Sequence, residues 1–272
     1  MKKLFSFAGL VVATAVVFSA SASANHSWGG YHWASTSSPF TLKLGDNVSG
    51  AWDSLLVQAS SDWSQSTVLD TTIVAGRTKP KSCRPTSGQV EVCSANYGNT
   101  GWLGLAQIWI SGQHITQGVV KNNDYYFGAS SYQYNNTAEM QHVICQEIGH
   151  TFGLDHQSTS GASLNTCMDY YHNTSSSDTT STSPNAGDYD QLLCIYDPAS
   201  KGKTLTSGSH TCTGTGHLDP SSTVRGSAGS LPDAVPSLSP ASQVAPSVYV
   251  DNLPNGDKLV TWVIWVNQKS HR

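Results

Sequence analysis

The chain has 272 residues, 12% of them charged, and a formal net charge of −4. This net negative charge argues against binding to nucleic acids and anionic membranes, so we expect neither as a partner. The length suits one core-bearing domain with an appendage and gives no indication of the oligomeric state.

Residues 1–24 have the pattern of a secretory signal peptide. Two lysines precede an apolar run that ends in Ala-Ser-Ala at residues 22–24, which predicts cleavage after Ala24. The run is too short to span a bilayer. Because the segment carries two lysines and no acidic residue, its removal changes the net charge from −4 to −6. We therefore expect a secreted, extracellular protein.

The exported chain contains six cysteines, an even number, and we expect them to form disulfide bonds. Proximity in the sequence favours two pairs and leaves a third. These pairs are Cys83 with Cys93, Cys194 with Cys212, and Cys145 with Cys167. A zinc site made of cysteines is the competing interpretation, but the sequence has no CxxC pair to support it.

Apolar residues predict the elements of the first half of the chain. They alternate over residues 40–44, as in a strand, and recur at spacings of three and four over 52–63, as in an amphipathic helix. Four strand-like runs follow, at residues 69–75, 89–95, 104–111 and 115–121.

A second helix is predicted from about residue 136. Asn136 followed by Glu139 resembles a capping box. The helix then carries a stripe of apolar residues spaced four apart, namely Met140, Ile144, Ile148 and Phe152. We expect this stripe to pack on the core, with the polar residues on the opposite face.

The most informative stretch is residues 146–156, QEIGHTFGLDH. On a helix, Gln146 and His150 point to the same side with about 6 Å of rise between them, so both can reach one ion. Glu147 lies on the adjoining face, where a carboxylate can act as general base on a metal-bound water. Gly153 allows the chain to turn through positive φ, and His156 returns toward the ion. The spacing predicts Gln146, His150 and His156 as metal ligands.

Two histidines of this helix are interpreted differently. A lone histidine is more often a hydrogen-bonded core residue than a ligand, but Glu147, Gly153 and His156 all fall at the required offsets from His150. His142 lies eight residues before His150, about 12 Å along the helix axis, which is too far to share one ion. We expect His142 at the surface or packed against a loop.

From Glu147 onward the stretch resembles HExxHxxGxxH, the zinc-binding pattern of the metzincin metalloproteases. Gln146 stands in place of the first histidine of that pattern. Residues 166–170, TCMDY, resemble the Met-turn that lies beneath the zinc in metzincins. Tyr170 has the position of a tyrosine that, in some branches, stabilises the tetrahedral intermediate, although matrixins lack it. An ordinary packed aromatic is the other interpretation of Tyr170. The resemblance implies Zn²⁺ as cofactor and Glu147 and Tyr170 as catalytic residues.

The resemblance covers roughly residues 40–196 and is greatest to matrixins. It implies an α+β fold with a twisted mixed β-sheet, an active-site helix, a Met-turn and a C-terminal helix, within a catalytic domain at residues 25–200. It also implies that a peptide substrate lies extended beside the edge strand, here Ala106–Ser111. Ser183 and Pro184 are the expected cap and first turn of the last helix.

The C-terminal part has two segments. Residues 201–246 are rich in Ser, Gly and Pro, which is typical of a linker or extension. Residues 247–272 predict a β-hairpin with Asn255 and Gly256 in its turn. A hairpin of this length is not stable alone and must dock on the main domain or on another chain. Trp262 and Trp265 either grip a ligand or polymer, or are buried against the domain.

Together these features predict a secreted zinc-dependent endopeptidase that acts on peptides or proteins. An amide is a weaker zinc ligand than an imidazole. The alternative is therefore a catalytically weak or inactive pseudoprotease that acts as a secreted binding protein. A third hypothesis is that the C-terminal hairpin binds a surface or a polysaccharide and the rest is scaffold.

Overall fold

A computed structural model describes residues 26–128, 132–205, 212 and 247–266. The predicted signal peptide and most of the predicted 201–246 linker lie outside the described residues, as do residues 267–272. Within the described ranges, no helix has both the length and the apolar character needed to cross a membrane.

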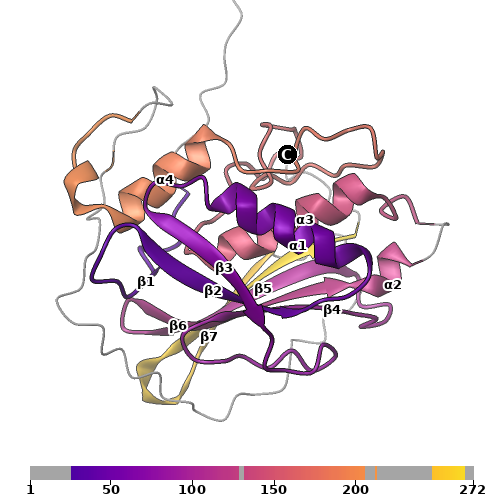
Figure 1. The fold of residues 1–272 in the computed structure, drawn as a ribbon, viewed down its shortest axis with the longest axis horizontal. Coiled ribbons are helices and arrows are strands. Elements are labelled where there is room, and N and C mark those ends of the chain that lie inside the picture. The colour runs from indigo at the N-terminus through magenta and orange to yellow at the C-terminus, as the bar shows by residue number, and fades with distance from the viewer. Residues whose placement is uncertain (1–25, 129–131, 206–211, 213–246, 267–272) are drawn as a thin grey trace, which may run out of the picture.

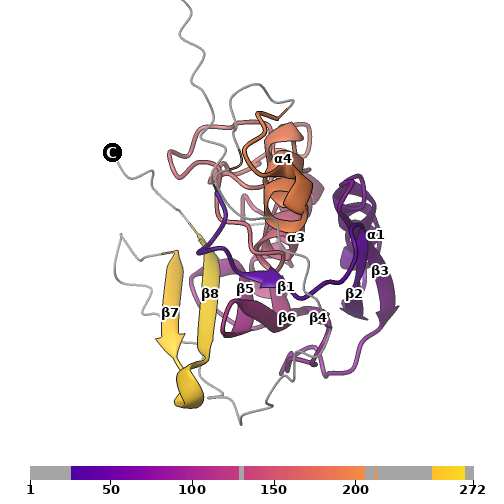
Figure 2. The same cartoon turned by 90° about the vertical axis from the view of Figure 1, so that its left-hand side faces the viewer.

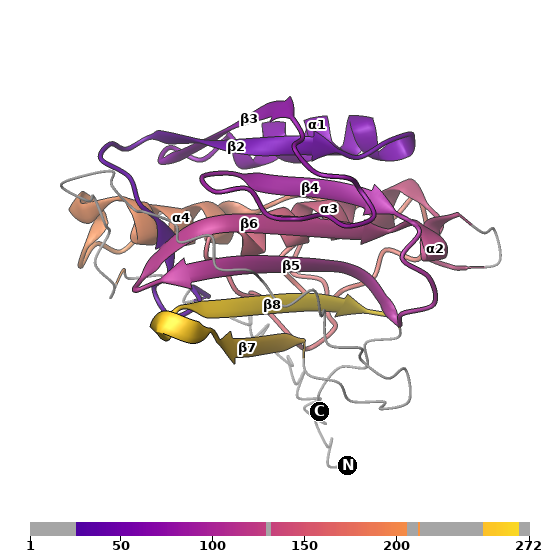
Figure 3. The same cartoon turned by 90° about the horizontal axis from the view of Figure 1, so that it is seen from below.

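One twisted mixed sheet organises the fold, with strand order β3-β2-β4-β6-β5-β8-β7 and β1 paired to β6 (Figure 3). Pairs among β1, β2, β3, β4 and β6 are parallel, whereas β5, β7 and β8 add antiparallel pairs. The strands are β1 (His32–Trp33), β2 (Phe40–Asn47), β3 (Leu69–Ala75), β4 (Val90–Ala95), β5 (Trp102–Ser111), β6 (His114–Asn123), β7 (Val248–Asn252) and β8 (Lys258–Trp265).

The longer helices cover one face of this sheet (Figures 1 and 2). They are α1 (Ala51–Trp63), α3 (Thr137–His150) and α4 (Ala186–Tyr196); α2 (Asp124–Phe127) is a single short turn, and η1 (Pro198–Ser200) and η2 (Pro254–Gly256) are 3-10 helices. The predicted α+β class with a twisted mixed sheet is therefore confirmed. The predicted strands and the first two helices lie within a few residues of their observed bounds.

The starts of α3 and α4 show how local side chains fix helix ends. Asn136 caps α3 by accepting a hydrogen bond from the Glu139 amide at 3.0 Å, which confirms the predicted helix start. The reciprocal half of the predicted capping box is replaced, because the Glu139 carboxylate accepts from His172 and the Asn173 amide instead. The prediction that Ser183 and Pro184 open the last helix is wrong. Asn185 caps α4 instead, because Asn185 and Asp188 exchange hydrogen bonds in a capping box.

Helix α3 is buried on every side. The predicted stripe of Met140, Ile144, Ile148 and Phe152 is buried, but so is every other residue of α3 after Thr137. The polar face is therefore not open to solvent over the length of the helix. Other elements cover it, and they decide the environment of its histidines.

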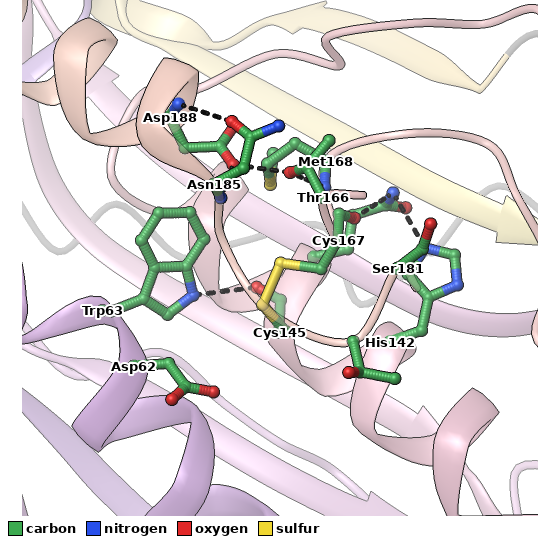
Figure 4. Close-up of a disulfide and its surroundings, with 12 residues drawn as sticks. Asp62, Trp63, His142, Cys145, Thr166, Cys167, Met168, Ser181, Asn185 and Asp188 are labelled. Carbon is green, nitrogen blue, oxygen red and sulfur yellow. Dashed lines mark hydrogen bonds between the residues drawn. A yellow bond between two sulfur atoms is a disulfide. The ribbon is translucent and has the colours of Figure 1, made fainter. Parts of the chain in front are cut away.

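All three predicted disulfides are present, namely Cys83–Cys93, Cys145–Cys167 and Cys194–Cys212. The second of these joins α3 to the segment at residues 166–170, with a Cα–Cα distance of 5.9 Å (Figure 4). A bond at this place limits how far the segment can move from the helix.

The C-terminal hairpin, residues 247–266, continues the main sheet (Figure 3). Strand β8 runs antiparallel to β5, with Trp262 opposite Ala106. Trp262 and Trp265 are both buried, which confirms burial against the domain rather than exposure as a gripping surface. The prediction that Ala106–Ser111 is a free edge strand is wrong, because β5 lies between β6 and β8.

Candidate functional site

The end of α3 and the turn after it are fixed by one glycine. Gly153 has φ of 90°, as predicted, and a Cβ at this position would lie 2.1 Å from the carbonyl oxygen of Tyr31. Only glycine therefore fits here without a shift of the backbone. The turn brings His156 back against His150, the last residue of α3.

His150 and His156 face each other through their Nε2 atoms, which are 3.1 Å apart. His150 Nδ1 lies 2.9 Å from the carbonyl oxygen of Leu154, and His156 Nδ1 lies 3.1 Å from Asp155 Oδ1. A carbonyl and a carboxylate can only accept, so both Nδ1 atoms carry the proton in the neutral rings. With these tautomers both Nε2 atoms present lone pairs to each other, which is unfavourable unless a shared cation, a proton or a metal ion, lies between them.

Burial disfavours a proton as that cation. Loss of solvent, with the neighbouring charge of His156, holds the pKa of His150 well below its usual value. Burial also lowers the pKa of His156, although the Asp155 carboxylate opposes the shift. Two tetrahedral zinc ligands with bonds of about 2.0–2.1 Å have nitrogens about 3.3 Å apart, close to the observed separation. The pair thus has the geometry and the tautomers of metal-binding histidines.

Gln146, the predicted third ligand, is tied to the 166–170 segment. Its amide nitrogen donates to the carbonyl oxygens of Cys167 at 2.7 Å and Asp169 at 2.6 Å. Its amide oxygen is buried and makes no hydrogen bond within the described residues. Among those residues, no three His, Cys, Asp or Glu side chains converge to hold a metal ion. Of the three predicted ligands, the structure brings His150 and His156 into contact.

Glu147 is buried between α3 and the strands β5 and β8. A Cβ on Gly104 of β5 would lie 3.1 Å from Glu147 Oε1, so the strand approaches the helix closely at this point. Neither carboxylate oxygen makes a well-formed hydrogen bond to the described residues. Burial raises the pKa of Glu147 well above its usual value, and the backbone of Ile264 only partly opposes this. A cation nearby would favour the ionised form.

Tyr170 lies against His156, with ring centroids 4.2 Å apart in an edge-to-face arrangement. Its hydroxyl contacts the hydroxyl of Ser247 at the start of the C-terminal hairpin. The structure buries the aromatic ring beside the histidine pair, a position that fits both a catalytic role and an ordinary packing role.

The 166–170 segment packs directly against α3, and the disulfide joins the two (Figure 4). A Cβ on Gly149 would lie 2.6 Å from Met168 Sδ, which shows how closely the buried methionine approaches the helix. Thr166 donates to Asp188 of α4 at 2.5 Å. The segment is therefore held by α4 on one side and by Gln146 and the disulfide on the other.

His142 belongs to a buried network that adjoins Gln146, whose amide nitrogen lies 3.4 Å from His142 Nε2. His142 lies 3.2 Å from the carbonyl oxygen of Asp169 and 3.6 Å from Glu139 Oε2. Glu139 also accepts from His172 Nδ1 at 2.5 Å and from the Asn173 amide at 2.6 Å. Of the two predicted environments for His142, packing against a loop is confirmed and a surface position is wrong.

Sequence patterns missed the residues that cover the site from distant elements. Trp262 stacks on His150, with ring centroids 5.0 Å apart and planes inclined by 8°. Near the N-terminus, the Trp28 amide donates to the Gly153 carbonyl at 2.9 Å, and the His26 carbonyl accepts from the Asp155 amide at 2.5 Å. None of these contacts has a periodic or motif signature.

The structure thus brings His150, His156 and Tyr170 together and places Gln146 and Glu147 in the same buried helix. No protein-family model matches the sequence, and the comparison with curated proteins found no match. The function must therefore be inferred from these residues and their geometry.

Proposed function

We propose that the chain is a secreted, zinc-dependent endopeptidase of the metzincin type. The observation that carries this proposal is the pair of buried imidazoles, whose Nε2 atoms are 3.1 Å apart while each Nδ1 is held by an acceptor. Such outer-shell acceptors are typical of histidines that bind metal. The three disulfides suit an oxidising compartment and support secretion.

His150, His156 and the unpaired amide oxygen of Gln146 would hold the ion. Bound Zn²⁺ supplies a Lewis acid and makes its water easier to ionise. Glu147 would take a proton from the attacking water and deliver it to the amine of the leaving peptide. The Tyr170 hydroxyl would donate a hydrogen bond to the scissile carbonyl oxygen as negative charge develops there.

The test combines metal analysis with turnover. After dialysis we expect close to one zinc per chain, and cleavage of a generic unfolded protein that a chelator or Glu147→Ala abolishes. Glu91→Gln is a matched control, because Glu91 is equally buried but belongs to a hydrogen-bond network at β4. A chain without zinc, whose weak cleavage is the same in wild type and Glu147→Ala, would refute the proposal.

A second candidate is a pseudoprotease that acts as a secreted binding protein. It is favoured by the two hydrogen bonds from the Gln146 amide to Cys167 and Asp169, because they give this side chain a structural role. In that case wild type and Glu147→Ala are equally inert, whereas Gln146→His gains zinc and activity. Wild-type cleavage that depends on Glu147 would exclude it.

A further inference from the structure

Strand β8 pairs with the whole outer side of β5. The register runs from Gly104 opposite Ile264 to Ile110 opposite Lys258. Addition of an extended segment to a sheet edge is a general way to bind peptides, in which main-chain hydrogen bonds supply affinity and alternate side chains supply specificity. The chain therefore supplies its own segment to the edge beside the candidate site.

The side chains of β8 reach the site itself. Val260, Trp262 and Ile264 alternate along the strand and pack in the same core as α3. Trp262 is fully buried and covers one face of the His150 ring. The backbone of Ile264 lies near Glu147, and Ser247 contacts the hydroxyl of Tyr170. The hairpin thus touches three of the residues proposed to carry the reaction.

We propose that β8 occupies the position of a substrate peptide and that the C-terminal hairpin is an intramolecular inhibitor of the site. This inference rests on the proposed function. A peptide can reach His150, His156 and Glu147 only after β8 leaves β5. Release requires breaking the β5–β8 pairing and unpacking Trp262 from the core, whereas the outer strand β7 is largely exposed and, among the described strands, pairs only with β8.

The contacts of β8 also define the chemistry of the competing ligand. Leu259, Val263 and Trp265 pack on the opposite face from Trp262, against apolar residues that include Trp102 and Trp109. The position therefore accepts an extended peptide that is apolar on both faces, with a bulky side chain directed at His150. Such segments are buried in folded proteins and exposed in unfolded ones.

The first test measures binding in the full-length protein. The probe is a fluorescein-labelled peptide with the sequence of residues 257–266, scored by anisotropy. Trp262→Ala weakens docking of β8 and should raise affinity for the probe at least about tenfold over wild type. Val250→Ala is the matched control, because Val250 is 47% exposed on the outer strand of the same hairpin. Equal affinities for the two variants would overturn the proposal.

A cross-link provides the converse test and does not depend on weakening the fold. Gln107 of β5 and Thr261 of β8 are opposite each other, with side chains in contact at 3.1 Å, so Gln107→Cys with Thr261→Cys should lock the strands together. Tyr249→Cys with Thr261→Cys links β8 to β7 only. The first pair should abolish probe binding and cleavage without lowering the melting temperature, whereas the second should behave like wild type.

The two proposals fail in different ways. If the locked variant cleaves protein as fast as wild type, the inhibitor proposal is overturned and the endopeptidase proposal stands. If no variant cleaves anything, but Trp262→Ala gains probe binding and the lock removes it, the inhibitor proposal stands for a peptide-binding site and the endopeptidase proposal fails.

Discussion

The indole of Trp262 lies almost parallel to the imidazole of His150, with ring centroids 5.0 Å apart and planes inclined by 8°. Trp262 comes from β8 of the C-terminal hairpin and His150 from the last turn of α3, so the hairpin and the helix end form one packed unit. The stacking leaves His150 Nε2 directed at His156. Hairpin and candidate metal site are therefore expected to respond to each other.

Gln146→Ala should lower the free energy of unfolding by about 1–3 kcal/mol, because it leaves the buried carbonyl of Cys167 without its donor and the carbonyl of Asp169 with His142 as its remaining partner. Gln141→Ala is the control in the same helix, since the buried amide of Gln141 has no hydrogen-bond partner within the described residues. Denaturant unfolding of both variants measures the difference. Equal losses would show that the Gln146 hydrogen bonds contribute little.

Asp155→Asn should weaken zinc binding about 10–100-fold, because Asp155 accepts the Nδ1 proton of His156 and so directs the Nε2 lone pair at the ion. Competition with a chromophoric chelator measures the affinity. Asp53→Asn, an exposed change on α1, should leave it unaltered. An unchanged affinity in Asp155→Asn would exclude His156 Nε2 as a ligand held in this way.

Gly153→Ala should destabilise the fold by about 1–3 kcal/mol more than Gly112→Ala. Both glycines have positive φ, at 90° and 64°, so both variants carry the cost of a left-handed residue. A Cβ at Gly153 also lies 2.1 Å from the Tyr31 carbonyl oxygen, whereas a Cβ at Gly112 has no heavy atom within 4 Å. Thermal unfolding compares them, and similar melting temperatures would contradict the close approach.

Replacing Cys145 and Cys167 by serine should cost about 3 kcal/mol of stability and also reduce the proposed proteolytic turnover, because the 166–170 segment is then free to shift relative to α3, which carries the proposed ligands. Replacing Cys194 and Cys212 is the matched control, since the sequence separations are 22 and 18. It should cost similar stability with little effect on turnover at a temperature where both variants are folded. Equal loss of turnover would argue against a positioning role for the first bond.

Glu139 should make stability depend on pH under acidic conditions. Burial alone would raise its pKa, but the charges and hydrogen bonds of His172 and His142 outweigh burial and lower the pKa from 4.5 to about 2. A lowered folded-state pKa means that the contribution is complete above pH 4.5 and is lost as the pH falls toward 2. The shift corresponds to about 3 kcal/mol.

Denaturant unfolding of wild type and Glu139→Gln between pH 6 and pH 2 measures this contribution. The difference in unfolding free energy between the two should shrink as the pH falls, because protonated Glu139 resembles glutamine. A difference that is constant over this range would show that Glu139 keeps an ordinary pKa in the folded protein.

The sequence by itself determined those features that depend on residues close together in the chain. Alternating and helical apolar periods predicted β2 and α1, and Asn136 with Glu139 predicted the start of α3. The spacing of His150, Gly153 and His156 predicted their convergence, because helix geometry and one positive φ angle act within seven residues. Disulfide pairing also followed from proximity in the chain.

Only the tertiary structure decided which distant groups meet. Burial of α3 on all sides, the tie of Gln146 to the 166–170 segment, and the stacking of Trp262 on His150 all join elements far apart in the sequence. Such contacts are set by how a whole sheet and its helices pack, which leaves no periodic pattern in the residues. For the same physical reason, the sequence predicted a hairpin but not that its strand would complete the sheet at the candidate site.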